Sequence, residues 1–312
     1  MPNQIDQSRF AYLVEKGLSK VYEEEIKFLS QTKPMRQKLF KTFPSDGAFS
    51  DFNSVGSLPD MPRFNGAITY ADVTPGFHTR IEPAEWAQGV EIEKKFWLNN
   101  LYNVLKDWPK KLTVAADRTK EKSAIQAYAT LNSTGFQFMQ SEEGVAIAST
   151  AHLTKDTNVV TSVGGFSNLG TSAFSPTSVE ATRILMRGFR DSNGEYLSVM
   201  PNGLIGPTTL DQKFEEVTRT EKGLYSAEGT VNVQAGKGWG WDTSQFFNDT
   251  STKNWMMVDW GLLADYALWI TRVENEHAEK YDFETKKIKT SLYDYWGWGF
   301  TDWRFVYFQA VS

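Results

Sequence analysis

The chain has three histidines, a residue type that can bind a metal or transfer protons: His78, His152 and His277. A zinc site needs three or four nitrogen, sulfur or oxygen ligands, and no second histidine stands within five residues of any of the three. We therefore expect histidines that make local hydrogen bonds or face solvent, and no metal site. The chain has no cysteine, which excludes disulfides, thiolate metal sites and cysteine nucleophiles.

The other patterns that could do chemistry are incomplete. Residues 164–170 (GGFSNLG) look like a phosphate loop but lack its Lys-Ser/Thr ending, and no Gly-x-Ser-x-Gly nucleophile turn occurs. The chain has adjacent carboxylates at Glu142-Glu143, Glu215-Glu216 and the run Glu23-Glu24-Glu25. Adjacent residues do not share a helical face, so these carboxylates make poor acid–base pairs. We therefore expect no catalytic residue, no cofactor and no enzyme activity.

Aromatic residues are unusually frequent, at 14% of the chain with 11 Trp and 21 Phe. They concentrate in residues 239–269 and 293–308. Aromatic side chains dominate protein cores and interfaces, so packing is the favoured interpretation. The stretch Gly238-Trp239-Gly240-Trp241 could also stack on sugar rings, because clustered exposed aromatics mark ligand sites. A carbohydrate-binding domain is therefore kept as an alternative from a different functional class.

Composition predicts a folded protein that is soluble at least until it assembles. The chain has 312 residues, 40% of them hydrophobic, and a net charge of -5. This length supports one large domain or two modest ones with a sizeable core, and the charge does not favour a strongly basic nucleic-acid binder. The N-terminus does not resemble a signal peptide. No apolar stretch approaches the roughly 18 residues that span a membrane, so we expect no membrane association.

Hydrophobic spacing predicts an α+β fold with one long helix. Helical periods occur in residues 5–30, 96–108 and 110–138, with Pro109 ending one helix and beginning the next. Residues 33–64 are rich in proline and small residues and predict an extended arm, while residues 66–95 predict a two-stranded hairpin. Isolated hairpins are marginal in water, so we expect this one to need a partner.

The second half of the chain is predicted to begin with a long loop and to end with a strand rich in aromatic residues. Residues 144–175 predict a loop, Ser175 a helix N-cap with Pro176 and Glu180 behind it, and Pro207 the start of another helix. Short strands are expected at residues 196–200, 231–233 and 255–260. Trp296, Trp298 and Phe300 alternate with glycines, a pattern typical of a strand buried on both faces.

A series of short motifs resembles the major capsid proteins of tailed bacteriophages with the Hong Kong 97-type fold, and within them the Mu-like major head subunits. Each motif is weak alone, but their shared order over residues 64–308 is specific. In chain order they are residues 90–96 (VEIEKKF), 115–121 (AADRTKE), 148–152 (ASTAH), 167–169 (SNL), 194–197 (GEYL), 201–207 (PNGLIGP), 254–258 (NWMMV), 268–274 with Arg272, and 297–304 (GWGFTDWR).

The resemblance implies four structural units. Residues 1–63 would form an N-terminal arm and residues 64–95 an extended loop that lies over a neighbouring subunit. Residues 96–190 and 291–312 would form a peripheral domain with a long spine helix. Residues 191–290 would form an axial domain that meets its copies at five-fold and six-fold axes. An encapsulin-type nanocompartment shell, which has the same fold, is the alternative within this class.

The resemblance also implies the partners and the place of the protein. It implies a homo-oligomer of pentamers and hexamers in an icosahedral shell around double-stranded DNA, with a separate scaffolding protein, a portal and only non-specific DNA contact. The chain would reside in the virion, and in the host bacterial cytoplasm during assembly. No lysine occurs between Lys41 and Lys94, so we expect no covalent crosslink from the loop. Deleting residues 70–88 is expected to leave a folded monomer that cannot assemble.

Overall fold

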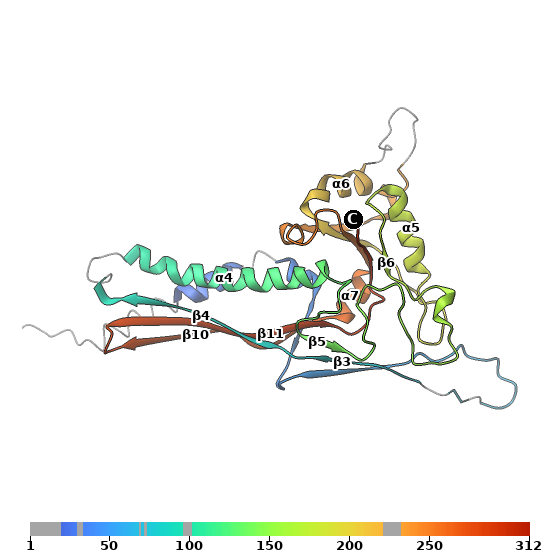
Figure 1. Ribbon diagram of the computed structural model, residues 1–312, viewed down its shortest axis with the longest axis horizontal. Coiled ribbons are helices and arrows are strands. Elements are labelled where there is room, and N and C mark those ends of the chain that lie inside the picture. The colour runs from blue at the N-terminus through green and yellow to red at the C-terminus, as the bar shows by residue number, and fades with distance from the viewer. Residues whose placement is uncertain (1–19, 30–33, 69, 72–73, 96–101, 221–231) are drawn as a thin grey trace, which may run out of the picture.

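The computed structural model describes residues 20–29, 34–68, 70–71, 74–95, 102–220 and 232–312. They form three sheets around one long helix. A long arm of the molecule consists of helix α4 (Tyr102–Ala129) lying along a four-stranded sheet, and a second lobe with a five-stranded sheet rises from one end of it (Figure 1). No helix in the described part of the chain is both long enough and apolar enough to cross a bilayer.

The long sheet has the strand order β1-β10-β11-β4. Its strands are β1 (Lys41–Pro44), β10 (Ala267–Asp282), β11 (Lys287–Phe300) and β4 (Ala84–Glu93). The alternation predicted for Trp296, Trp298 and Phe300 is confirmed, because all three are buried beneath α4 and α2 (Met35–Leu39). Gly297 and Gly299 lie on the opposite face, where a Cβ would come within 2.8 Å of Pro83 and 2.5 Å of Ile81 respectively.

A buried ionic network joins α4 to the long sheet. Lys120 Nζ lies 2.7 Å from Asp294 Oδ1 and donates a hydrogen bond to Asn275 Oδ1 at 2.9 Å. The Asn275 amide donates to Asp294 at 2.7 Å. Asn275 has a φ of 53° and lies at an irregularity in the pairing of β10 with β11. The irregularity in β10 therefore directs the backbone amide of Asn275 to Asp294 and its side-chain carbonyl to Lys120.

The five-stranded sheet has the order β6-β12-β9-β7-β8. Its strands are β6 (Leu169–Gly170), β12 (Val306–Gln309), β9 (Trp255–Val258), β7 (Gly203–Pro207) and β8 (Gly240–Ser244). Helix α5 (Pro176–Arg187) begins at the predicted N-cap, where Ser175 Oγ accepts from the amide of Ser178. Ser178, and not Glu180, closes the capping box. Pro207 is followed by the 3₁₀ turn η2 (Thr208–Leu210) and helix α6 (Asp211–Arg219).

The remaining elements connect these units. They are β2 (Ser50–Val55), β3 (Pro75–Ile81), β5 (Met139–Ser141), η1 (Thr161–Val163), η4 (Ala235–Lys237), η5 (Gln245–Phe247) and α7 (Trp260–Tyr266). Residues 20–29 are helical, as expected for that part of residues 5–30. The expected helical residues 5–19 and 96–101, and Val231, lie outside the described residues.

Several expectations about the first 140 residues are wrong. Residues 34–55 are not a structureless arm, because Leu39 and Phe40 are buried in the core and β1 pairs with β10. Residues 64–95 are not a hairpin, because β3 pairs with β2 and β5 while β4 pairs with β11. Pro109 lies inside α4 without ending it. An interior proline removes one N–H from the helix and crowds the carbonyl four residues before it, but Leu112 beyond Pro109 packs against Tyr22 and Leu292 and holds this part of the helix on the body.

Expectations about three other segments also differ from the structure. The long helix ends at Ala129 and not near residue 138, because residues 130–132 form a turn. Residues 196–200 contribute only one isolated bridge, from Tyr196 to Arg190. Residues 267–290, expected in the axial domain, belong to the long sheet, and residues 306–309, expected in the peripheral domain, are an inner strand of the other sheet.

Candidate assembly surfaces

The most prominent surface feature is a hairpin that we call the extended loop, residues 50–81. Strands β2 and β3 form its root, with Ser50 opposite Ile81 and Asn53 opposite His78. Asp51 accepts two hydrogen bonds from the Arg80 guanidinium, at 2.8 and 3.1 Å. These bonds, together with the charges of Arg80 and His78, hold the pKa of the Asp51 carboxyl below its usual range. The root is therefore a regular, cross-linked ribbon.

The root of the extended loop is fixed to the body at two places. Strand β5 pairs with β3, which makes the root a three-stranded sheet. At the outer end of the root, the Ser57 amide donates to Ser192 Oγ at 2.8 Å and the Asn193 side chain donates to the Ser57 carbonyl. Gly56 and Thr74 still hydrogen-bond across the ribbon at 2.9 Å. Beyond them the described chain projects away from the body (Figure 1).

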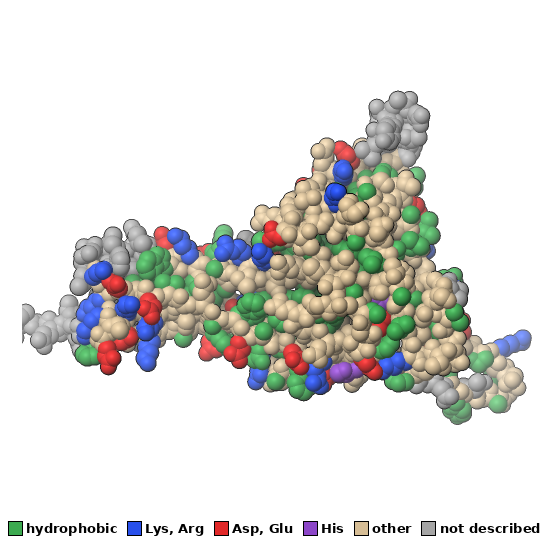
Figure 2. Space-filling view, viewed as in Figure 1, with side chains coloured by type: hydrophobic (Ala, Val, Ile, Leu, Met, Phe, Trp, Pro, Cys, Tyr) green, Lys and Arg blue, Asp and Glu red, His purple; other side chains and the backbone are tan. Residues whose placement is uncertain are grey.

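The outer part of the extended loop exposes large apolar side chains. Met61 is 95% exposed and Tyr70 is 88% exposed. Four more are well exposed: Val55, Leu58, Phe64 and Ile68. Green side chains accordingly mark the protrusion at the lower right of Figure 2. Single exposed apolar residues are ordinary, but a contiguous group of them marks an interaction surface.

A groove of about 630 Å³ lies beside the root of the extended loop. One wall consists of β2 and β3, and the others come from β1, residues 153–155, residues 191–192 and the turn at residues 300–304. Aromatic side chains contribute much of its lining: Phe43, Phe52, Phe77, Tyr266, Phe300 and Trp303. The groove and the extended loop therefore place exposed apolar groups side by side on one part of the surface.

The histidines lie far apart and are held by local contacts. His78 Nε2 is 3.2 Å from Asp51, and His277 Nε2 is 3.1 Å from Thr290 Oγ1. His152 is buried and stacks on Trp303 with ring centroids 4.1 Å apart. Among the described residues, no group of three or more His, Asp or Glu side chains could hold a metal ion.

The carboxylate pairs do not form catalytic dyads either. Glu142 pairs with Lys155 at 2.7 Å while Glu143 faces His152 Nδ1 at 2.9 Å. Glu215 pairs with Arg219, and Glu216 accepts from Gln212. Each adjacent pair therefore has its two members directed to different partners, as expected for neighbouring residues. The run Glu23–Glu25 lies on the helical residues 20–29, where Glu24 is 3.9 Å from Lys20.

The tryptophan cluster is part of the core. Trp239 is buried and its Nε1 donates to Gln234 at 3.1 Å. Trp241 packs edge-to-face on Phe214, with ring centroids 6.2 Å apart. Trp241 is half-buried, and the Arg219 guanidinium lies 5.5 Å over its ring. The geometry therefore does not favour the carbohydrate-binding alternative.

A family model described as "Phage capsid protein" matches residues 78–308, well over half of the chain. The chain belongs to this family. No curated protein matches the capsid protein in sequence. The family favours a phage capsid subunit over both alternatives, the encapsulin shell and the carbohydrate-binding domain. The Mu-like group within the family stays a prediction.

Solved capsid structures share the fold at low sequence identity. The capsid of Ralstonia phage GP4 is 10% identical, with a TM-score of 0.54 over 87% of this chain and 86% of that one. A chain of Mycobacterium phage Adephagia is 10% identical, with a TM-score of 0.53 over 89% and 90%. The capsid of an empty GTA particle is 8% identical, with a TM-score of 0.51 over 88% and 89%. The capsid protein therefore has the Hong Kong 97-type fold.

Sequence patterns did not predict the buried hydrogen-bond network around Asn168 of the capsid protein. Asn168 is fully buried, and its side-chain NH₂ faces the carbonyls of Ile147, Trp303 and Val306. Its Oδ1 accepts from the Ser149 amide and lies 3.0 Å from His152 Nε2. The sequence predicts only a loop over residues 144–175, which contain Asn168. The only signal in the sequence was that His152 and Asn168 both lie in motifs that resemble capsid proteins, residues 148–152 and 167–169.

Proposed function

We propose that copies of this capsid protein assemble into the icosahedral head of a tailed phage, as pentamers and hexamers that enclose double-stranded DNA. The observation that carries the proposal is the extended loop, whose large apolar side chains are left exposed by the part of the chain that the structure describes. Burial of apolar surface contributes about 25 cal/mol per Å². Obligate interfaces commonly bury more than ~2,000 Å². A subunit with such a loop gains stability by covering it with another copy.

We further propose how the units of the fold take part. Helix α4 and the long sheet would form the peripheral domain, and the five-stranded sheet with α5 and α6 the axial domain at the five-fold and six-fold axes. The supporting observation is that these two units have separate sheets with separate helices on them. These boundaries replace those expected from the sequence.

The proposal includes the partners that the family resemblance implies. A separate scaffolding protein and a portal would assist assembly, and packaged DNA would make non-specific contact only, since phosphate binding needs dense Lys and Arg clusters. The chain would be a structural subunit and not an enzyme. It would reside in the virion, and in the host bacterial cytoplasm while heads assemble.

The proposal is tested by shortening the extended loop. Residues 57–73 are replaced by an Asn-Gly turn, because Gly56 and Thr74 already face each other across the ribbon and Asn-Gly suits a two-residue hairpin. We expect a subunit with an unchanged circular dichroism spectrum and melting temperature that forms no shells in electron micrographs. The deletion of residues 70–88 is a poor test, because it removes the fully buried Ile81 and would unfold the protein.

A second variant keeps the length of the loop. Leu58, Met61 and Phe64 are each changed to Ser. The matched control is Val233→Ser, because Val233 is also well exposed but lies on the second lobe. The triple variant should lose assembly and the control should retain it. Normal shells from the shortened loop would contradict the proposal.

A further inference from the structure

We propose that Glu143, His152 and Asn168 form a proton-dependent clamp at the junction of the three sheets. In this clamp the imidazole ring of His152 holds two protons, and the clamp weakens when one of them is lost. The clamp is a property of the single subunit. The inference therefore goes beyond the proposed assembly and is tested without shells.

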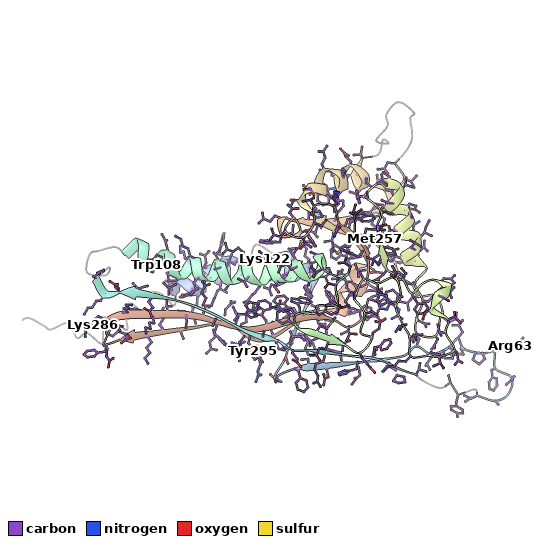
Figure 3. The ribbon with its side chains drawn as sticks, in the orientation of Figure 1. Arg63, Trp108, Lys122, Met257, Lys286 and Tyr295 are labelled. Atoms are coloured by element: carbon purple, nitrogen blue, oxygen red, sulfur yellow. The ribbon has the colours of Figure 1, made fainter. Side chains whose placement is uncertain are left out.

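The three sheets of the fold meet at one junction in the body of the subunit. Strand β5 belongs to the root of the extended loop, β11 to the long sheet and β12 to the five-stranded sheet. Residues 301–305 connect the end of β11 directly to the start of β12. In Figure 3 the second lobe, marked by Met257, meets the long sheet, marked by Tyr295, in a region crowded with side chains. Contacts in this region therefore hold the sheets together.

The clamp joins segments from each side of this junction. Glu143 and His152 lie in the segment that follows β5, and Asn168 directly precedes β6 of the five-stranded sheet. The Asn168 side chain donates to the carbonyl of Trp303, in the connection between β11 and β12, at 3.4 Å. A change in the clamp therefore reaches all three sheets.

The orientation of the Asn168 carboxamide is fixed by its other partners. Its NH₂ group donates to the Ile147 carbonyl at 2.7 Å, and a carbonyl oxygen can only accept. Its Oδ1 accepts from the Ser149 amide at 2.8 Å, and a backbone amide can only donate. Exchanging the two ends of the carboxamide would break both bonds. Asn168 therefore presents an acceptor to His152 Nε2, which lies 3.0 Å away.

The other ring nitrogen of His152 also faces an acceptor. Its Nδ1 is 2.9 Å from Glu143 Oε1, and the same oxygen accepts from the Leu153 amide at 2.9 Å. A neutral imidazole has one donor and one acceptor nitrogen, whereas an imidazolium has two donors. A neutral ring would therefore direct one nitrogen lone pair at an oxygen lone pair. The geometry fits an imidazolium paired with the Glu143 carboxylate.

Burial makes the second proton important for stability. The His152 side chain is 1% exposed and that of Glu143 is 10% exposed, so water does not replace a bond that the ring loses. A buried polar group without its partner destabilises the folded state. The ring also stacks on Trp303, with planes 3° apart, and an aromatic face attracts a cation. Both contacts therefore favour the charged ring.

Other charged groups around the clamp are balanced by partners of their own. Arg304 lies 4.8 Å over the Trp303 ring, and Asp302 pairs with it at 2.7 Å. Lys155, three residues after His152, pairs with Glu142 at 2.7 Å. Glu143 is the carboxylate in direct contact with the ring. The protonation of His152 is therefore coupled mainly to Glu143.

The extra proton determines how the stability of the subunit depends on pH. A histidine in an unfolded chain loses its proton near pH ~6.5. Above that pH the clamp holds one proton more than the unfolded chain, so the free energy of unfolding falls as the pH rises. The contribution of the clamp is fully present below pH ~6.5 and is lost at higher pH, when the folded ring gives up its proton. The chain has no cysteine and only three histidines, so few other groups titrate in this range.

Nuclear magnetic resonance of the unassembled, full-length subunit tests the protonation directly. The histidines are isotope-labelled, and the nitrogen chemical shifts distinguish a protonated from a bare ring nitrogen. We expect both nitrogens of His152 to be protonated at about pH 7.5, where an ordinary histidine is mostly neutral. The signals are assigned by their loss in His152→Gln. A bare nitrogen on His152 at that pH would overturn the inference.

Thermal unfolding between about pH 6 and pH 9, the range in which histidines titrate, tests the consequence. The melting temperature of the unchanged chain should exceed that of His152→Gln most at the acidic end, and the difference should shrink as the pH rises. His78→Gln is the matched control, because His78 also faces a carboxylate, Asp51 at 3.2 Å, but its side chain is 37% exposed. The control should follow the unchanged chain throughout. A difference for His152→Gln that does not change with pH would contradict the inference.

Glu143→Gln provides a second variant if His152→Gln does not fold. It keeps the ring and the shape of the clamp but removes the negative charge. The amide of the new glutamine can donate to Nδ1, so a neutral ring then satisfies both contacts. We expect one bare nitrogen on His152 at about pH 7.5 in this variant. Two protonated nitrogens in this variant would show that Glu143 does not hold the second proton.

Discussion

Buried polar residues in this protein connect segments that are far apart in sequence. Lys120 on α4 and Asp294 on β11 are buried and meet the half-buried Asn275 of β10. Breaking a buried ion pair by removing one partner typically costs about 3–5 kcal/mol, because the other charge is left buried. The network therefore fixes the position of the long helix on the sheet more specifically than apolar packing alone.

The variant Lys120→Met should lower the free energy of unfolding of the unassembled subunit by about 3–5 kcal/mol, measured by urea denaturation. The double variant Lys120→Met, Asp294→Leu should recover most of that loss, because no uncompensated charge remains. Lys122→Met is the control. Its pair with Asp249 at 3.3 Å is exposed, and exposed pairs contribute about 0–1 kcal/mol. Equal losses for Lys120→Met and Lys122→Met would show that the buried pair has no special role.

At the scale of elements, Gly299 of β11 lets the root of the extended loop approach the long sheet closely. A Cβ on Gly299 would lie 2.5 Å from Ile81 at the inner end of β3. Ile81 is fully buried, so a shift of its side chain would disturb the packing around it. The glycine therefore leaves room for the root of the loop to pack directly on the backbone of the long sheet.

The variant Gly299→Ala should destabilise the subunit by about 1–3 kcal/mol, the usual cost of overpacking a core. Gly236→Ala is the control, because a Cβ there has no atom within 4 Å and should leave the melting temperature unchanged. Thermal unfolding followed by circular dichroism measures both. A Gly299→Ala subunit as stable as the Gly236→Ala subunit would mean that Ile81 has room to shift.

The sequence predicted the elements better than their pairing. Periodicity located α4, the cap of α5 and the aromatic strand β11, since each depends on residues close in sequence. It could not assign β3 to β2, because residues 33–64 contain four prolines and look unstructured in isolation. Strand pairing depends on which distant segment offers matching backbone and side chains, and no local pattern encodes that. The sequence could not predict the groove for the same reason, since its walls come from eight separate parts of the chain.

For the whole molecule, the absence of a lysine on the extended loop leads to a direct prediction. No lysine occurs between Lys41 and Lys94, so the tip has no amine that could form an isopeptide bond. Shells heated in sodium dodecyl sulfate should release a single band at the subunit mass of 35.4 kDa. Bands at multiples of that mass would show a covalent bond from another residue.

The parallel pairing of β1 with β10 also bears on how the protein is made. Lys41 leaves the ribosome early, whereas its partner Leu268 is translated near the end of synthesis. Until then Leu39 and Phe40 have no core to enter. Folds whose contacts join distant residues form slowly and expose aggregation-prone surface while they wait. We therefore expect the nascent chain to depend on chaperones. The long sheet closes only after most of the chain has been translated, so we expect unfinished subunits not to dock on one another.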